Sequence, residues 1–185
     1  MHRKSKEKFL ITGGYGFIGS SVIRLLLKKG EYVGNIDKLT YSANIHSLEG
    51  LENKSNYLFF HNDICNELEL FKIIETFQPT KVIHLAAETH VDRSIDNPSN
   101  FIQSNIIGTY NLLNCCYQYW SSLKLDKRND FRFLLVSTDE VYGSLETKQN
   151  LFTEESNYEP NSPYSASKAA SDLLGRAWSK TYGLP

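Results

Sequence analysis

The fold is decided by the stretch FLITGGYGFIG, which covers residues 9–19. A short run of β-forming residues leads into a Gly-x-x-Gly-x-x-Gly loop made by Gly13, Gly16 and Gly19, and a helical pattern follows. Glycine suits a loop that must turn tightly, let a pyrophosphate approach the backbone and let the helix pack closely on the sheet. The helix N-terminus would face the phosphate charge. Taken alone, the loop could also be an ordinary glycine-rich turn, so the rest of the chain has to decide.

Five short apolar runs rich in β-forming residues continue the pattern. Because they are largely apolar, we expect each to be a strand buried on both faces of a sheet. Helical patterns lie between them. This alternation predicts an α/β fold with a doubly wound parallel sheet of the Rossmann type, covered by helices on both sides. The expected strands are Lys8–Thr12, Tyr32–Asp37, Tyr57–His61, Lys81–Leu85 and Phe131–Ser137.

The helices are predicted from apolar residues that recur on one face. Gly30 is expected to end the first helix, and Pro98 to precede a long helix that begins near Asn100. A polar, turn-rich segment from Ser144 to Pro163 fits an active-site loop before a final helix at about Tyr164–Tyr182. The predicted apolar faces are Ile18, Val22, Leu25 and Leu26, then Leu70, Ile73, Ile74 and Phe77, and then Ile102, Ile106, Leu113 and Cys116.

Composition excludes some classes of partner. The chain has 20 basic and 21 acidic residues, so no broad cationic face is expected for nucleic acid or a membrane surface. No apolar run approaches the roughly 20 residues of a membrane span, and the polar start lacks a signal-peptide core, so we expect a cytoplasmic protein. Cys65, Cys115 and Cys116 are odd in number and are expected to be buried apolar filler, neither a disulfide framework nor a metal site.

An acidic residue at the end of the second expected strand indicates the cofactor. Asp37 stands eighteen residues after Gly19, close to the spacing at which a carboxylate accepts hydrogen bonds from the adenosine ribose hydroxyls. Its charge would repel a 2′-phosphate, so NAD is favoured over NADP. Lys38 could partly neutralise that phosphate and keeps NADP open. Asp63 and Ile64 end the third expected strand where an adenine edge would lie, although a polar strand terminus explains them equally well.

A tyrosine and a lysine share one face of the final expected helix. Tyr164 and Lys168 are four residues apart and so within mutual reach. A free tyrosine, with a pKa of about 10, is a poor base at neutral pH until a nearby cation stabilises the phenolate. So tuned, it can take the proton of a sugar hydroxyl while hydride leaves the same carbon for a nicotinamide. An exposed helical pair is the alternative interpretation.

The segment VSTDEVYG, residues 136–143, follows the fifth expected strand directly. In a doubly wound sheet, ligands sit at the carboxyl ends of the strands. Thr138 could donate a hydrogen bond to the sugar hydroxyl that is oxidised. Asp139 and Glu140 offer two carboxyl groups of different protonation state, one as acid and one as base. Simple oxidation or epimerisation needs neither carboxyl group.

Three motifs carry a resemblance to a known family: STDEVYG at 137–143, AAETHVDRS at 86–94 and DKLTY at 37–41. With the spacing of the three glycines, they make the chain similar, from Phe9 onward, to the extended short-chain dehydrogenases/reductases. Among these it resembles the nucleotide-sugar 4,6-dehydratases that act on dTDP-glucose. The resemblance implies that Tyr164 is the base for oxidation at C4, that Glu140 removes the C5 proton and that Asp139 protonates the departing C6 hydroxyl.

The resemblance also implies a set of binding residues. Thr89 and Thr138 would face the sugar, while His84 and His90 are given no proton transfer and are expected to have structural roles. NAD would be bound by Gly13, Gly16, Phe17, Ile18, Gly19, Asp37, Lys38, Leu39, Thr40, Asp63, Ile64, Leu85, Ala86, Ala87, Thr89, Ser104, Tyr164 and Lys168.

Members of the resembled family are longer than this chain. Residues 1–185 are therefore expected to be an incomplete NAD-binding domain that is truncated after the active-site helix. The domain that binds the nucleotide diphosphate is expected to be absent. Two interpretations follow: an active dehydratase, or a catalytically incompetent NAD-binding module. A related nucleotide-sugar epimerase or decarboxylase is a third, which the adjacent carboxylates argue against. Aromatic residues on the helices at 100–120 and 164–182 suggest a homodimer, unless they only cap the core or contact the missing domain.

Overall fold

The computed structural model describes residues 6–145 and 151–185, and its centre is a five-stranded parallel sheet. The strand order is β3-β2-β1-β4-β5, so the chain changes direction across the sheet between β1 and β4. This change creates a crevice at the carboxyl ends of β1 and β4, where doubly wound folds bind ligands. The strands are β1 (Lys8–Thr12), β2 (Tyr32–Asp37), β3 (Tyr57–His61), β4 (Lys81–His84) and β5 (Arg132–Leu135). The predicted Rossmann architecture is confirmed.

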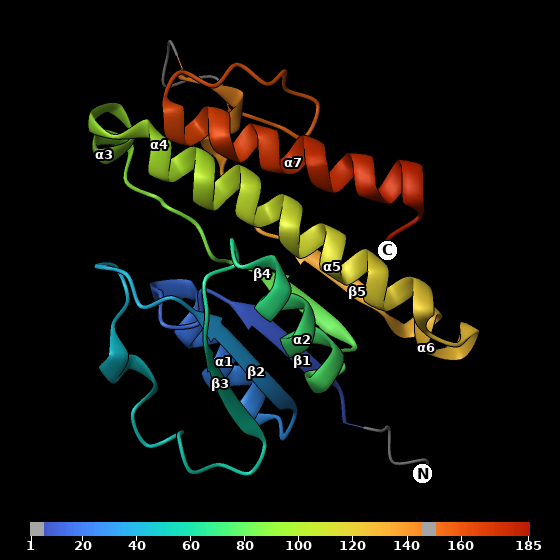
Figure 1. Ribbon diagram of the computed structural model, residues 1–185. Helices are drawn as coiled ribbons and strands as arrows, with labels where there is room; N and C mark the ends of the chain where they lie inside the picture. The colour runs from blue at the N-terminus through green and yellow to red at the C-terminus, as the bar shows by residue number, and fades with distance from the viewer. Residues whose placement is uncertain (1–5, 146–150) are drawn as a thin grey trace.

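Helices cover both faces of the sheet (Figure 1). Helix α1 (Phe17–Lys28) packs on one face, where its apolar residues join Ile11, Val33 and Tyr57 in one core cluster. Helices α2 (Glu67–Phe77) and α5 (Gly108–Ser122) cover the other face and share a second cluster with Leu10 and Val82. Helix α7 (Pro163–Tyr182) runs beside α5 at the top of Figure 1. The shorter elements are η1 (Ile45–Leu48), α3 (Val91–Asp96), α4 (Pro98–Phe101), η2 (Ile102–Ile107), α6 (Leu125–Asp130) and η3 (Asp139–Tyr142).

Two of the strands are not buried on both faces, and that expectation is wrong for them. Leu58 in β3 is 54% exposed and Leu134 in β5 is 55% exposed. Both strands lie at the edges of the described sheet, so each has only one neighbouring strand. Two strands are also shorter than expected, since β4 ends at His84 and β5 begins at Arg132.

The apolar face predicted for the first helix is also wrong in part. Ile23, Leu26 and Leu27 are buried, whereas Ile18 and Leu25 are more than half exposed. The face is displaced because Gly19 and Ser20 lie against the glycine loop and the sheet, so the helix approaches with small residues at its start. The face predicted for α2 is confirmed, because Leu70, Ile73, Ile74 and Phe77 are all buried.

The long helix near residue 100 contains an irregularity that its sequence pattern hides. Pro98 is its first residue, and η2 is a π-helical segment between α4 and α5. A π-helical turn holds more residues than an α-helical turn, so it shifts the buried face along the helix. As a result Ser104 and Asn105 point inward, while Ile102 is 45% exposed, contrary to the predicted face. Leu113 and Cys116, beyond the irregularity, are buried as predicted.

The last helix begins where a polar cap is available. The Ser162 hydroxyl accepts a hydrogen bond from the Ser165 backbone N–H, the Ser165 hydroxyl bonds back to Ser162, and Pro163 occupies the first turn. Part of the expected active-site loop, residues 146–150, lies outside the described residues. Cys115 and Cys116 are buried as expected, whereas Cys65 is only partly buried, so that expectation is wrong for Cys65. Burial raises the pKa of the Cys115 thiol to about 12. Among the described residues, no helix is long and apolar enough to cross a membrane.

Candidate active site

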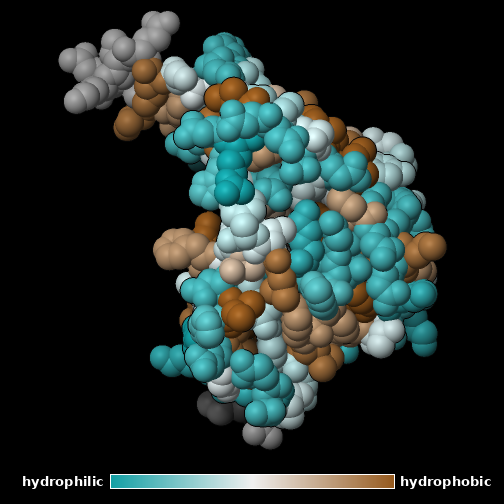
Figure 2. All heavy atoms as spheres, turned by 60° about the vertical axis from the view of Figure 1, so that its left-hand side comes forward, coloured by the Kyte–Doolittle hydropathy of each residue, from teal (hydrophilic) through white to brown (hydrophobic). Residues whose placement is uncertain are grey.

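A cleft of about 500 Å³ opens at the carboxyl ends of the strands. Its volume falls within the range of small-molecule and cofactor sites, about 300–1,000 Å³. Figure 2 shows the surface hollowed on this side of the molecule, between the upper and lower parts of the view. The cleft is lined by every residue expected to bind the cofactor except Leu39. It is also lined by Ile36, Ser42, Ala43, Asn62, Glu88, His90, Val136 and Ser137.

The glycine loop forms a cradle that leaves no space for a side chain at Gly13, Gly14 or Gly19. Gly13 has φ +74°, and a Cβ there would lie 2.7 Å from the backbone nitrogen of Ala86. A Cβ on Gly19 would lie 2.2 Å from the carbonyl oxygen of Gly13. Gly16 caps α1 without a side-chain hydrogen bond, and the first turn has no acidic residue. Free backbone N–H groups at a helix N-terminus bind anions, so the cradle fits a pyrophosphate.

Asp37 ties the glycine loop to the end of β2. One carboxylate oxygen accepts from the backbone N–H of Tyr15 at 2.9 Å, and the other accepts from the N–H of Leu39 at 2.8 Å. Leu39 has φ +57°, a conformation rare for a residue with a side chain. The turn after β2 is therefore held by Asp37, and it directs Lys38 and Thr40 into the cleft.

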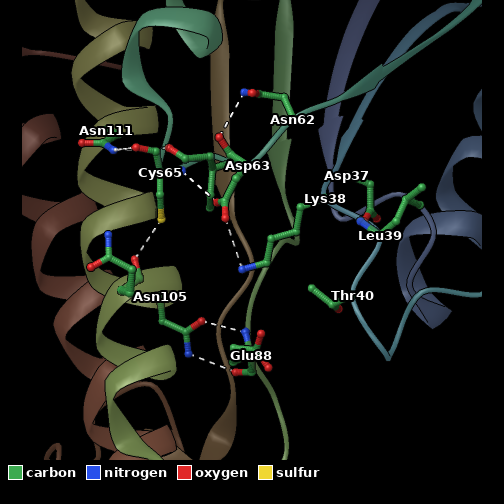
Figure 3. A network of polar contacts seen from close by, with 12 residues as sticks. Asp37, Lys38, Leu39, Thr40, Asn62, Asp63, Cys65, Glu88, Asn105 and Asn111 are labelled. Carbon is green, nitrogen blue, oxygen red and sulfur yellow. Dashed lines mark hydrogen bonds and ion pairs between the residues drawn. The ribbon is translucent and has the colours of Figure 1, made fainter.

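Lys38 and Asp63 meet across the side of the cleft, where Figure 3 shows Lys38 from the end of β2 pointing toward Asp63 after β3. Lys38 Nζ lies 3.5 Å from Asp63 Oδ2. The other oxygen of Asp63 accepts from the backbone N–H of Cys65 at 2.9 Å, which fixes the carboxylate. The two side chains are 33% and 40% exposed. Both residues were predicted for the cofactor site, but their pairing was not.

Asn105 was missed by sequence reasoning and positions the segment after β4. Its side chain is buried, with its oxygen accepting from Glu88 N–H at 2.8 Å and its nitrogen donating to Glu88 O at 3.0 Å (Figure 3). The same nitrogen lies 2.8 Å from Ser167 Oγ on α7. Asn105 thereby joins the cleft segment to the helix that carries Tyr164. Its signal in the sequence was weak, because an asparagine in an apolar helical pattern becomes inward-facing only through the π-helical turn.

His84 is buried and forms part of the support beneath the cleft. Thr12 Oγ1 accepts from the N–H groups of Leu85 and Ala86, both at 3.2 Å, so its own hydrogen is directed to His84 Nδ1 at 2.7 Å. His84 Nε2 then carries the proton and faces Thr109 Oγ1 at 2.9 Å. Burial, assisted by the charge of Lys168, lowers the pKa of His84 to about 3. The histidine is thus neutral and structural, as expected.

The structure brings Thr138, Asp139 and Glu140 next to Tyr164. Thr138 caps η3 by accepting from the Glu140 N–H at 3.3 Å. Burial raises the pKa of Tyr164 above its ordinary value, a hydrogen bond with Thr138 lowers it, and the charges of Glu140 and Asp139 raise it. These three residues lie beside the cleft, whereas Tyr164 and Lys168 line it. The phenol of Tyr164 therefore lies between the cleft and the carboxyl groups of Asp139 and Glu140.

Lys168 is buried and held by backbone, not by the phenol. Its Nζ donates to the carbonyl oxygen of Val136 at 2.7 Å. Burial lowers the pKa of Lys168, and the nearby charge of Asp172 raises it. Asp172 was also missed in the sequence. Its carboxylate accepts from Ser137 and, at 3.0 Å, from the Tyr158 hydroxyl, and so it joins α7 to the end of β5 and to the loop before α7.

Comparison with known proteins gives a consistent set of relatives. The model of the GDP-mannose 4,6 dehydratase family matches residues 10–185. A dTDP-glucose 4,6-dehydratase of Salmonella typhimurium is 54% identical over 187 residues, and the match covers 96% of this chain and 52% of that protein. The chain spans about half the length of the curated relatives it matches.

Solved structures agree with this result. The dTDP-glucose 4,6-dehydratase DesIV from Streptomyces venezuelae, crystallised with NAD, has a TM-score of 0.85 and 40% identity, with coverage of 96% of this chain and 53% of that one. A Thermus thermophilus UDP-glucose 4-epimerase, also in complex with NAD, has a TM-score of 0.81 and 30% identity, with coverage of 96% and 52%. The fold is shared by dehydratases and epimerases alike, so the site must separate them.

Proposed function

The chain belongs to the GDP-mannose 4,6 dehydratase family, and from that premise we propose that it carries the NAD site and the reacting residues of a dTDP-glucose 4,6-dehydratase. The observation that carries the proposal is the meeting of Thr138, Asp139 and Glu140 with Tyr164 at the carboxyl edge of the sheet. An epimerase would need the tyrosine but not the adjacent carboxyl pair. The sequence relatives named for the dTDP-glucose reaction support the choice of substrate.

The residues of the cleft fit NAD. The glycine cradle and the N-terminus of α1 would hold the pyrophosphate, and Asp37 would accept hydrogen bonds from the adenosine ribose. Asp63 and Ile64 would border the adenine, while Ala86, Ala87 and Ser104 would line the side toward the reacting end. The chemistry that NAD would supply there is hydride acceptance from C4 and hydride return to C6, with C5 regaining a proton as the hydride returns. Dehydratase and epimerase structures with NAD bound support this assignment.

The chain's own residues then divide the proton transfers between them. Thr138 orients the C4 hydroxyl, and Tyr164 takes its proton as C4 is oxidised. Oxidation at C4 acidifies the proton at C5, which Glu140 removes. Asp139 donates a proton to the C6 hydroxyl as it leaves as water. Lys168 keeps a positive charge near the phenol from its anchor on Val136. Thr89, at the edge of the cleft, would face the sugar.

The proposal extends to domain organisation and partners. We assign residues 1–185 to an NAD-binding domain and the grip on the nucleotide diphosphate to a domain that the longer relatives possess. Tyr110 on α5 and Tyr182 on α7 are 40% and 46% exposed, and Trp178, also on α7, is in edge contact with both rings. This aromatic surface supports a homodimer through α5 and α7. A cytoplasmic location belongs to the same proposal, since NAD and nucleotide sugars are used there.

One experiment separates the candidate functions. The purified chain is incubated with NAD and dTDP-glucose, while NAD binding is measured by calorimetry and the 4-keto-6-deoxy sugar by chromatography. Formation of the product supports the dehydratase and contradicts an inert module. A chain that binds no NAD contradicts the proposal at its base. UDP-glucose converted to its C4 epimer would favour the epimerase.

A second candidate function is favoured by the length of the relatives. The chain spans about half the length of the curated relatives it matches. Contacts to remote parts of a substrate normally support orientation at the reacting carbon. The second proposal is therefore that residues 1–185, taken by themselves, bind NAD without turnover. NAD binding without product in the same experiment identifies this case.

In an active chain, Asp139→Asn tests the division of roles. It should slow the release of water more than the oxidation at C4, because Asn cannot donate the required proton. Asp126→Asn removes an equal charge from exposed α6 and serves as the matched control. Equal slowing of both steps in Asp139→Asn would contradict the role given to this residue.

A further inference from the structure

The ion pair between Lys38 and Asp63 bears on which dinucleotide the cleft accepts. Lys38 directly follows Asp37, at the side of the cleft where the adenosine ribose would lie under the proposed function. A basic residue at this place can act as the counter-ion of a 2′-phosphate and so admit NADP. Whether Lys38 does so depends on where its ammonium group is directed.

The structure directs this ammonium group toward Asp63. Lys38 Nζ lies 3.5 Å from Asp63 Oδ2 (Figure 3). One hydrogen bond and one backbone turn hold the pair in place. The N–H of Cys65 fixes Asp63 at 2.9 Å, and the turn at Leu39, with φ +57°, fixes the backbone that carries Lys38. Lys38 is therefore aimed at the next strand end by its own backbone turn.

The negative charge of Asp37 alone repels the 2′-phosphate of NADP only in part. Both of its oxygens already accept backbone hydrogen bonds, from Tyr15 and Leu39, and these N–H groups offset part of its negative charge. A free lysine next to it would offset more. With Asp37, Lys38 and Asp63 counted together, the formal charge at this side of the cleft is −1, and it would be zero without Asp63.

We propose that Asp63 is a specificity-determining residue. It disfavours NADP because its ion pair with Lys38 leaves the ammonium group less able to bind a 2′-phosphate. This inference rests on the proposed NAD site and adds to it a second carboxylate that acts through a lysine. It also gives Lys38 a definite part, since an ammonium group that is already paired cannot serve as the counter-ion of the 2′-phosphate at full strength.

The test compares two dissociation constants, those of NADP and NAD, each measured by calorimetry on the whole chain. Their ratio isolates the 2′-phosphate, because any contact of Asp63 with the adenine affects both dinucleotides equally. Asp63→Asn should lower the ratio roughly threefold to tenfold, since the pair is partly exposed and such pairs are weak. The Asn side chain keeps an acceptor for the Cys65 N–H, so the loop retains its geometry.

Four further variants make the test specific. Lys38→Met should raise the ratio, and in the Lys38→Met, Asp63→Asn double variant the decrease caused by Asp63→Asn should be largely lost. Asp126→Asn, which removes a remote exposed charge, should leave the ratio at the wild-type value. Asp63→Glu should keep the ion pair and with it the preference for NAD.

The inference and the proposed function fail in different ways. If the wild-type chain binds NAD and Asp63→Asn leaves the ratio unchanged, the inference is overturned and the NAD site stands. The inference is likewise overturned if the double variant shows the full decrease, because Lys38 would then play no part. A wild-type chain that binds neither dinucleotide contradicts the proposed site and this inference together.

Discussion

The ammonium nitrogen of Lys168 lies 2.7 Å from the carbonyl oxygen of Val136, at the point where β5 gives way to the segment that carries Thr138, Asp139 and Glu140. The cation is thus anchored between α7 and the end of the sheet. Burial raises the pKa of Tyr164, the hydroxyl of Thr138 lowers it, and the charges of Glu140 and Asp139 raise it.

The first prediction concerns the phenol of Tyr164. In the cofactor-free chain its pKa should lie above the ordinary value of about 10, mainly because of burial. Glu140→Gln should lower this pKa by removing a negative charge, and Thr138→Val should raise it by removing a hydrogen bond. Ultraviolet titration of each variant against its Tyr164→Phe counterpart isolates the signal. A wild-type phenol that titrates below 10 would refute the account.

The second prediction concerns His84 and the pH dependence of stability. The pKa of His84 is lowered to about 3 in the folded chain, whereas an unfolded histidine titrates near about 6.5. Between these values the unfolded state binds the extra proton, so stability falls as the pH drops below about 6.5, by up to about 1.4 kcal/mol per pH unit. Urea unfolding from pH 7 to pH 4.5 measures this slope.

His84→Gln should remove that contribution to the slope, while His46→Gln, at an exposed site, should leave it intact. Nitrogen-15 NMR offers an independent check, because the hydrogen bonds place the proton on Nε2 of a neutral ring. A charged ring at pH 6, or a proton on Nδ1, would be incompatible with the network through Thr12.

The third prediction uses two glycines with opposite surroundings. Gly19→Ala would push a Cβ to 2.2 Å from the Gly13 carbonyl oxygen, so the loop must shift. We expect a loss of about 1–3 kcal/mol in the free energy of unfolding and a large loss of NAD affinity. Gly30→Ala has open space around its Cβ but a φ of +82°. It should cost about 1–2 kcal/mol and leave NAD affinity unchanged.

Thermal unfolding and calorimetry on both variants supply the comparison. Equal loss of NAD affinity in the two would mean that general destabilisation, and not the shape of the cradle, limits binding. The contrast is informative because both substitutions are Gly→Ala and both glycines lie at or near the ends of α1.

The fourth prediction concerns Asp172. Burial raises the pKa of Tyr158 to about 12, and the hydrogen bond and charge of Asp172 add to the shift. Asp172→Asn should bring the Tyr158 titration back toward about 10 and should lower the pKa of Lys168 further. Titration in a Tyr158→Phe background is the control, where the high-pH change should vanish. If the pKa of Tyr158 is unchanged in Asp172→Asn, the contribution of Asp172 to the raised pKa of Tyr158 is contradicted.

Much of the architecture could be predicted because it depends on local patterns. The glycine spacing, the acid after β2 and the alternation of apolar runs define a Rossmann sheet, and the strand bounds agree to within a few residues. The burial of β3 and β5 was misjudged because an apolar strand looks the same at an edge as at the centre. Which strand lies at the edge is a property of the whole sheet order.

The site could be predicted as a collection of residues, but not as a network. Nearly all expected cofactor residues line one cleft, since the carboxyl ends of parallel strands converge. The contacts of Asn105 and Asp172 join segments 14 to 62 residues apart, and no sequence period reports such pairs. The attachment of Lys168 to Val136 instead of Tyr164 likewise depends on tertiary geometry.

The π-helical turn at Ile102–Ile107 lets one continuous helix contact both the cleft region and the hydrophobic core. Within the turn, Ser104 lines the cleft and Asn105 holds the backbone of Glu88. Beyond the turn, Leu112 and Leu113 of the same helix are buried in the core. Because the helix is stiff, a tilt of α5 caused by a core substitution also moves Asn105. Asn105 is hydrogen-bonded to Glu88 and Ser167, so these two residues move with it. The positions of the residues around the cleft therefore depend on the packing of core residues that do not line the cleft.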